Sequence, residues 1–330
     1  MNINPPELSL RRGLPSLAAV ALIATALAAC GGAVASGSTV KATATSTGIK
    51  AAKWGRNVTV TYTSTKVRIR ANGIPNHSRD AQYAVPNAGV VVPNASTATI
   101  ANDPTKANSF DYSLPLKPTW SSTTTAASLG SIGPMISGSV LFNPYEGDGS
   151  TVAMASNFSL AGSNGTRVWF VDSCSGHPTP APSGIYHYHG LPACVKSQVD
   201  TATGPSHIIG LALDGYPIYG QRDIHGKTVA LSALDKCNGL KSATPEFPKG
   251  TYHYVLTTAA SAQSSIRCFH GKVDKSLITT MPNMGGGGPP GGGGPPGGGP
   301  PPGLKSASVG IHTVAAIAAT RLFCPLGSLL

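Results

Sequence analysis

Short runs of β-forming residues dominate the hydrophobic pattern of the chain between residues 54 and 275. Residues 58–62 (VTVTY) and 66–70 (KVRIR) alternate or concentrate β-formers, as half-buried strands do. Further β-rich runs lie at 140–142, 167–171, 184–188, 208–213 and 251–257. No long segment has helical apolar spacing, and glycine and proline interrupt the chain throughout. The pattern predicts a mainly β, loop-rich, β-sandwich-like single domain over residues 54–275.

The start of the chain has the three-part order of a secretory signal. Arg11 and Arg12 precede an apolar run over residues 17–29, which Cys30 and two glycines follow. This run is shorter than the roughly 20 residues that a membrane-spanning helix needs. Cleavage of residues 1–29 is therefore predicted rather than a permanent span.

The residues around the cleavage point indicate the kind of signal. Leu27-Ala28-Ala29-Cys30 resembles the lipobox of bacterial lipoproteins, in which the cysteine thiol receives a diacylglyceryl group. We expect lipidation of Cys30, with ordinary cleavage and a free Cys30 as the alternative. Each buried methylene contributes about 0.8 kcal/mol, so several acyl chains would anchor the protein to a membrane of the cell envelope, on the outer surface or facing the periplasm.

Composition divides the rest of the chain. Residues 30–53 are rich in alanine, serine, threonine and glycine, which predicts a flexible tether. Residues 276–303 include a tract of glycine and proline alone, expected to be a low-complexity linker. Residues 304–330 form a C-terminal tail in which Cys324 has no obvious partner.

The net charge of +11 is spread thinly, because only 11% of the residues are charged. Basic residues form no run with interleaved aromatic residues, so the sequence argues against a nucleic-acid partner. Diffuse attraction to anionic envelope surfaces is the more modest interpretation.

Four cysteines lie in one stretch of the predicted domain: Cys174, Cys194, Cys237 and Cys268. They form no Cys-x-x-Cys pair, and disulfides persist in exported proteins, so disulfides are favoured over a cysteine zinc cluster. Three pairings are formally possible. Proximity in the sequence favours Cys174 with Cys194 and Cys237 with Cys268, which would staple the domain.

Histidine and tyrosine alternate in the run Gly184-Ile185-Tyr186-His187-Tyr188-His189-Gly190. Successive side chains of a strand point to opposite faces, so both histidines are predicted on one face and both tyrosines on the other. Imidazoles at positions i and i+2 lie roughly 6 to 7 Å apart along a strand. They are close enough to share one metal ion with a third ligand.

Other segments supply candidates for the remaining ligands. Tyr252-His253-Tyr254 repeats the pattern, His177 follows Asp172-Ser173-Cys174, and His207 and Asp214 flank the apolar run 208–213. The expected metal site therefore contains His187, His189 and His253, completed by His177 or Asp214. Neutral imidazoles suit zinc or copper. The side chains expected to pack against and orient these ligands are Tyr186, Tyr188, Tyr252, Tyr254 and Asp172.

Other interpretations of the same residues stay open. The histidines and tyrosines also fit a hydrogen-bonded network without an ion, or an acid–base catalytic site. Asp214 precedes Gly215, so capping of its own turn is the simpler account of it. His77 is expected in a surface loop and His225 at a hairpin tip. Nucleophile-elbow, zincin and phosphate-loop motifs are absent, so the sequence assigns no enzyme class.

Tyr186-His187-Tyr188-His189 is the name-giving motif of the YHYH domain family, which the chain resembles over residues 58–271. Further segments match in the family order: 73–77, 132–144, 172–178, 207–220, 234–239, 252–254 and 268–271. The resemblance implies an exported protein, often tethered or multidomain, and names no biochemical activity. Two departures are Ile136–Val140, where relatives are expected to have Asn-Gly-Val, and His270.

Two functions follow as competing expectations. The first is a lipid-anchored envelope protein with a histidine-centred zinc or copper site. The second is a non-catalytic binding or adhesion module, in which the histidines and tyrosines are structural and a tyrosine-lined groove binds an envelope polymer such as a glycan.

Overall fold

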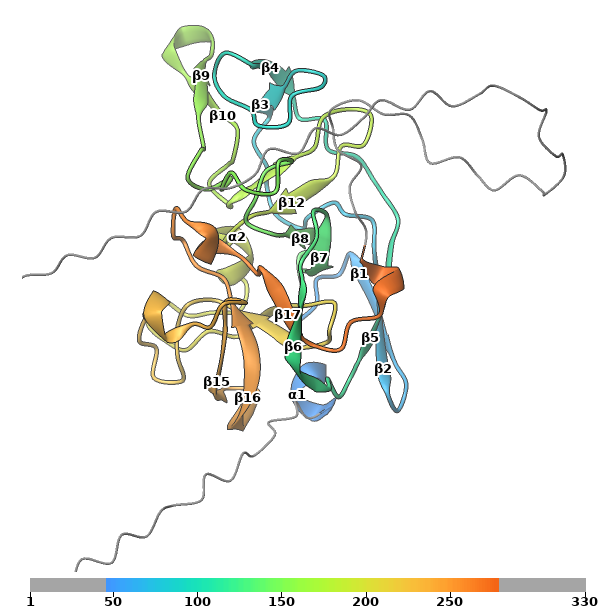
Figure 1. Cartoon of the computed structure of the whole chain (residues 1–330). Helices are drawn as coiled ribbons and strands as arrows, with labels where there is room; N and C mark the ends of the chain where they lie inside the picture. The colour runs from blue at the N-terminus through green and yellow to red at the C-terminus, as the bar shows by residue number, and fades with distance from the viewer. Residues whose placement is uncertain (1–45, 279–330) are drawn as a thin grey trace, which may run out of the picture. The chain divides into compact units, whose positions relative to one another are not determined.

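The computed structural model describes residues 46–278 (Figure 1). The predicted signal peptide with Cys30, most of the predicted tether, most of the glycine–proline segment and the tail with Cys324 lie outside the described residues. The expectations about those segments stay predictions. Within the described residues, no helix is long and apolar enough to cross a membrane.

The described residues are mainly β, as predicted. The strands are β1 Val58–Tyr62, β2 Lys66–Ala71, β3 Gln82–Pro86, β4 Ala98–Asn102, β5 Phe110–Pro115, β6 Trp120–Ala126, β7 Ser131–Pro134, β8 Val140–Phe142, β9 Ser159–Ala161, β10 Arg167–Trp169, β11 Gly176–Pro178, β12 Tyr186–Tyr188, β13 Ile208–Leu211, β14 Pro217–Tyr219, β15 Gly239–Thr244, β16 Phe247–Val255 and β17 Cys268–Gly271. The helices are α1 Ser46–Lys50 and α2 Ala193–Lys196, with 3-10 turns η1 Ser163–Gly165, η2 Leu231–Ala233, η3 Ala262–Ser264 and η4 Lys275–Leu277.

These strands form several small sheets rather than two large facing ones. The two largest have four strands each, in the orders β7-β8-β12-β11 and β13-β14-β16-β15. A three-stranded sheet has the order β1-β2-β5, and the pairs β3-β4, β9-β10 and β6-β17 complete the described part. Loops therefore connect many short strands, as the density of glycine and proline predicts.

The two four-stranded sheets share one topology. In each, the outer pairs are antiparallel and the central pair is parallel: β8 with β12, and β14 with β16. Their edge strands β7 and β13 also contact each other reciprocally. Ile136 N donates to Ile209 O at 2.9 Å, and Leu213 N donates to Ile132 O at 3.1 Å. Ile136 and Leu213 are 77 residues apart in the sequence, and so are Ile132 and Ile209. The two sheets are therefore two copies of one structural unit.

Glycine permits this close approach of β7 and β13. A Cβ atom at Gly133 would collide with the carbonyl oxygen of Leu211, and one at Gly210 would lie 2.8 Å from Pro134 O. A side chain at either position would push the two edge strands apart. Gly133 and Gly210 are equivalent positions of the two copies, so each copy contributes one glycine to the junction.

The duplication extends to the turns that precede β11 and β15. Asp172 Oδ1 accepts hydrogen bonds from the backbone N–H groups of Cys174 and Gly176. In the second copy, Asp235 Oδ1 accepts from Cys237 and Gly239 in the same way. Each turn places one disulfide cysteine two residues after its aspartate.

Both expected disulfides are present. Cys174 bonds to Cys194 across 20 residues, and Cys237 bonds to Cys268 across 31 residues. The first links the turn before β11 to α2, and the second links the turn before β15 to β17. Each copy of the duplicated unit is thus fastened by its own cross-link.

The start of the packed structure lies upstream of the predicted boundary at residue 54. Ile49 of α1 is fully buried and belongs to the main hydrophobic core. The expectation of a flexible tether over 30–53 is therefore wrong for this end of the range. Ile49 is a single apolar residue among small polar ones, so no periodicity marked its burial.

Candidate metal centre

Three buried histidines converge where β11 and β12 pair. The register sets His177 of β11 opposite His187 of β12, and His189 follows directly after β12. Their exposed fractions are 6%, 3% and 2%, and one nitrogen from each lies within 4.8 Å of the others. His187 and His189 lie on one side of the strand, as the alternation predicts.

Backbone carbonyl groups fix which ring nitrogens carry hydrogen. His187 Nδ1 lies 3.0 Å from Ile185 O, and His189 Nδ1 lies 2.7 Å from Asn143 O. A carbonyl oxygen only accepts, so both Nδ1 atoms donate and both Nε2 atoms carry lone pairs in the neutral rings. Hydrogen bonding of one imidazole nitrogen to a carbonyl is also what histidines bound to metals commonly show.

The two lone pairs face each other. His187 Nε2 and His189 Nε2 are 3.0 Å apart. If one Nε2 atom carried the hydrogen instead, the Nδ1 atom of the same neutral ring would have a lone pair facing a carbonyl oxygen. Every neutral arrangement of the two rings therefore contains one repulsive contact. A cation bound to both nitrogens removes that repulsion. Two ligands of a tetrahedral zinc ion lie about 3.3 Å apart, close to this separation.

His177 completes the cluster. Both of its ring nitrogens are buried and have no hydrogen-bond partner. Its ring centroid lies 4.5 Å from that of His187 and 5.2 Å from that of His189. Unpartnered buried polar atoms are rare and need an explanation. A bound ion would supply the missing partner.

Burial also keeps these rings neutral. Desolvation lowers the pKa of His177 and the pKa of His187 well below the usual value for histidine. The neighbouring histidines lower these two pKa values further. Desolvation lowers the pKa of His189 to about 4, although its bond to Asn143 opposes the shift. A neutral imidazole is the form that binds a metal ion, so the cluster is ready to bind one at neutral pH.

Two other groups of metal-type side chains among the described residues include disulfide sulfur atoms. One contains His77 with Cys174 and Cys194, and the other contains His270 and Asp235 with Cys237. A metal ion binds thiolates, which these oxidised cysteines cannot offer. Among the clusters of the described chain, the three histidines are therefore the favoured metal centre.

The remaining predicted ligands lie elsewhere. His253 belongs to β16 in the second copy, where its Nδ1 faces Thr251 O and its ring packs against Tyr219. Asp214 is fully buried in a turn: it accepts from Tyr216 N, Tyr254 Oη and Gly271 N. The structure brings together His177, His187 and His189, and it brings neither His253 nor Asp214 to them.

The duplication explains the position of His253. It corresponds to His187, because each lies between two tyrosines in its own copy. The positions equivalent to His177 and His189 are Leu240 and Val255. The second copy therefore keeps one imidazole of the three and cannot form the same cluster.

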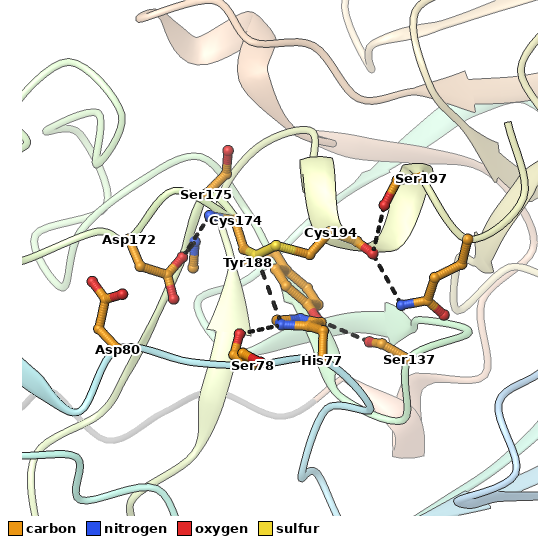
Figure 2. Close-up of a disulfide and its surroundings, with 12 residues drawn as sticks. His77, Ser78, Asp80, Ser137, Asp172, Cys174, Ser175, Tyr188, Cys194 and Ser197 are labelled. Atoms are coloured by element: carbon orange, nitrogen blue, oxygen red, sulfur yellow. Dashed lines mark hydrogen bonds between the residues drawn. A yellow bond between two sulfur atoms is a disulfide. The ribbon is translucent and has the colours of Figure 1, made fainter. Parts of the chain in front are cut away.

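The tyrosines expected to orient the ligands face away from them. Tyr186 Oη donates to Asp172 Oδ2 at 2.7 Å, and Tyr252 Oη donates to Asp235 Oδ2 at 2.9 Å in the second copy. Tyr188 Oη meets Ser137 Oγ and His77 Nε2, beside the disulfide of Cys174 and Cys194 (Figure 2). Tyr186, Tyr188 and Asp172 form a polar network on the opposite side of β12, and Tyr252 makes the equivalent bond in the second copy.

The other histidines have separate environments. His77 was expected in a surface loop, yet it is half-buried and contacts Cys174 and Tyr188 (Figure 2). His207 forms an ion-pair contact of 2.8 Å with Glu246, and His225 lies exposed in its hairpin turn as predicted. His270 stacks on Trp120.

Sequence reasoning missed the residues that surround the three histidines. Phe142 of β8 stacks on His187 with ring centroids 3.9 Å apart, and Asn143 holds His189 through its carbonyl. Glu146 lines the same cavity as the histidines. The match of residues 132–144 to the family order was the one signal near these positions.

Comparisons with known proteins agree with the sequence motif. The family sequence model described as YHYH protein matches residues 111–230 and 221–271. No curated protein and no solved structure matches the chain. The match begins later than residue 58, where the sequence resemblance starts, and it contains the whole duplicated unit and the histidine cluster. By these residues the chain belongs to the YHYH family.

Proposed function

We propose that this protein binds one transition-metal ion, zinc or copper, through His177, His187 and His189. The observation that carries the proposal is the pair of Nε2 atoms of His187 and His189, which face each other at 3.0 Å while both Nδ1 atoms face carbonyl oxygens. Three imidazoles leave a fourth coordination position for water or a ligand, as in catalytic rather than structural zinc sites.

The metal content of purified protein tests this proposal. We would express residues 30–330 with Cys30→Ser, without a histidine tag, in an oxidising compartment, and measure zinc and copper by elemental mass spectrometry. Wild type should carry about one ion per chain. His187→Ala and His177→Ala should each weaken metal affinity at least about 100-fold. Loss of a group that only orients a ligand already costs up to about 100-fold, and loss of the ligand itself should cost more.

His253→Ala is the matched control, because it removes the same side chain from the equivalent position of the second copy. This variant should keep the wild-type metal content. A folded wild-type protein that takes up neither zinc nor copper would contradict the proposal, and it would favour a hydrogen-bonded histidine network in an adhesion or glycan-binding module.

We also propose that the mature protein is an exported lipoprotein of the cell envelope, which presents the metal site outside the cytoplasm. The lipobox-like Leu27-Ala28-Ala29-Cys30 supports this assignment, and two disulfides suit an oxidising compartment. The unmodified gene expressed in bacteria should give a protein that partitions into the detergent phase with the mass of a diacylated chain. Cys30→Ser should move it to the aqueous phase, and aqueous wild type would contradict lipid anchoring.

A further inference from the structure

A small cavity of about 90 Å³ opens beside the three histidines. It has room for more than one water, which takes about 30 Å³, and is smaller than the roughly 150 Å³ cavity that binds benzene in an engineered protein. Its other walls are largely apolar and include Val90, Val91, Phe142 and Phe170. None of the described lining residues is a lysine or arginine. The cavity thus suits a compact molecule with an apolar body, and positive charge in it would come from a bound metal ion.

Glu146 is the acidic residue in this lining. Its side chain is only 8% exposed, and its Oε1 atom is buried without a hydrogen-bond partner. Burial, and to a lesser extent the charge of Asp148, raises the pKa of Glu146 to about 8. In the metal-free protein the carboxyl group is therefore mainly protonated at neutral pH. Its buried, unpartnered oxygen is available for a hydrogen bond with a molecule in the cavity.

The second copy shows what this position does when it has only a structural role. Asp223 corresponds to Glu146: Gly226 N donates to Asp223 O at 2.9 Å, and Gly149 N donates to Glu146 O at the same distance. The Asp223 side chain caps its own turn by accepting from the N–H groups of His225 and Lys227.

In the first copy another residue caps the turn. Asp148 accepts from the N–H groups and hydroxyls of Ser150 and Thr151. The Glu146 carboxyl group therefore does not cap its turn. The Glu146 side chain is buried and lines the cavity.

We propose that the cavity binds a small carbonyl compound with an apolar body, whose carbonyl oxygen lies within reach of both the metal ion and the Glu146 carboxyl group. The proposal rests on the metal site proposed above and adds the ligand class and the residue that selects it. Short amides, aldehydes and ketones have this chemistry, since a carbonyl oxygen accepts a hydrogen bond and can also coordinate a metal ion.

Ligand-observed NMR tests the proposal by measuring how propionamide binds to zinc-loaded protein. The protein is the chain of residues 30–330 with Cys30→Ser. Glu146→Leu should weaken binding about five- to tenfold, the effect of losing one hydrogen bond. Glu146→Gln should stay within about twofold, because its amide still donates. Asp223→Ala, the matched control from the second copy, should bind like wild type.

Two results would overturn the ligand proposal: no saturable binding to metal-loaded protein, or wild-type affinity in Glu146→Leu. The metal content of every sample is measured before ligand is added. Absence of metal from wild type therefore counts against the proposed metal site, whereas normal metal content with either of the two results counts against the ligand pocket alone.

Discussion

Lowering the pH from 7 to 5.5 should destabilise the metal-free protein by about 3 kcal/mol, a large share of the total stability of a typical domain. The cause is a set of buried neutral imidazoles: His177, His187, His189 and His253. Burial lowers the pKa of all four, and to about 4 for His189 and His253. In the unfolded chain a histidine has a pKa of about 6.5.

The sign follows from which state binds more protons. Below about pH 6.5 the unfolded chain takes up protons that the folded chain refuses, so stability falls as the pH falls toward the folded pKa values. Each ring contributes a loss of slightly more than about 1 kcal/mol between pH 7 and 5.5. Glu146, whose pKa is raised to about 8, acts in the opposite direction and recovers about 2 kcal/mol over the same interval.

Urea unfolding at a series of pH values measures this dependence after metal has been removed with a chelator. His253→Phe keeps an aromatic ring beside Tyr219 and removes one titrating group outside the metal cluster. The loss of stability of this variant should therefore be smaller by about 1 kcal/mol. His225→Gln is the control, because this exposed side chain is in water in both states. Zinc should protect the protein against acid, since bound metal competes with protons for the imidazoles. A pH-independent stability of the metal-free wild type would contradict the assignment of buried neutral rings.

The sequence predicted those strands that carry a clear period of two or a concentrated β-rich run. The bounds of β1 and β8 agree with the predicted 58–62 and 140–142, and β2 differs by one residue. Strands such as β11 Gly176–Pro178 and β17 Cys268–Gly271 were missed because they are short and contain glycine, proline, cysteine or histidine in place of β-branched residues. Their conformation depends on their neighbours in the fold.

The candidate site was predictable to the extent that its geometry is local. Alternation within one strand places His187 and His189 together, and a hairpin of nearby residues adds His177. His253 has the same local pattern, yet it was assigned to the wrong neighbourhood. Whether His177 or His253 is the third histidine of the cluster depends on how the two copies fold into separate sheets. No local sequence pattern reveals this. Comparing 186–189 with 252–255 shows that the second copy ends in valine, and this was the available signal.

Loss of either disulfide should be the other large effect, and the two losses should differ in what they do to the metal. In the chain-entropy model, closing 31 residues between Cys237 and Cys268 contributes about 4 kcal/mol, and closing 20 residues between Cys174 and Cys194 contributes about 3 kcal/mol. Each pair is replaced by serine in a double variant, and the free energy of unfolding is measured by urea at pH 7.5 in the presence of zinc.

Only the loss of the first disulfide should also weaken zinc binding. Cys174 lies in the turn that leads into β11, three residues before His177, and its sulfur bonds to Cys194 at α2 (Figure 2). Freeing this turn lets His177 move relative to His187, whereas the second disulfide holds the copy that lacks the cluster. Cys237→Ser/Cys268→Ser should therefore keep wild-type zinc affinity in the fraction that is folded, although it loses more stability. Equal loss of zinc affinity in both double variants would mean that the metal site depends on the stability of the whole domain and not on the turn before β11.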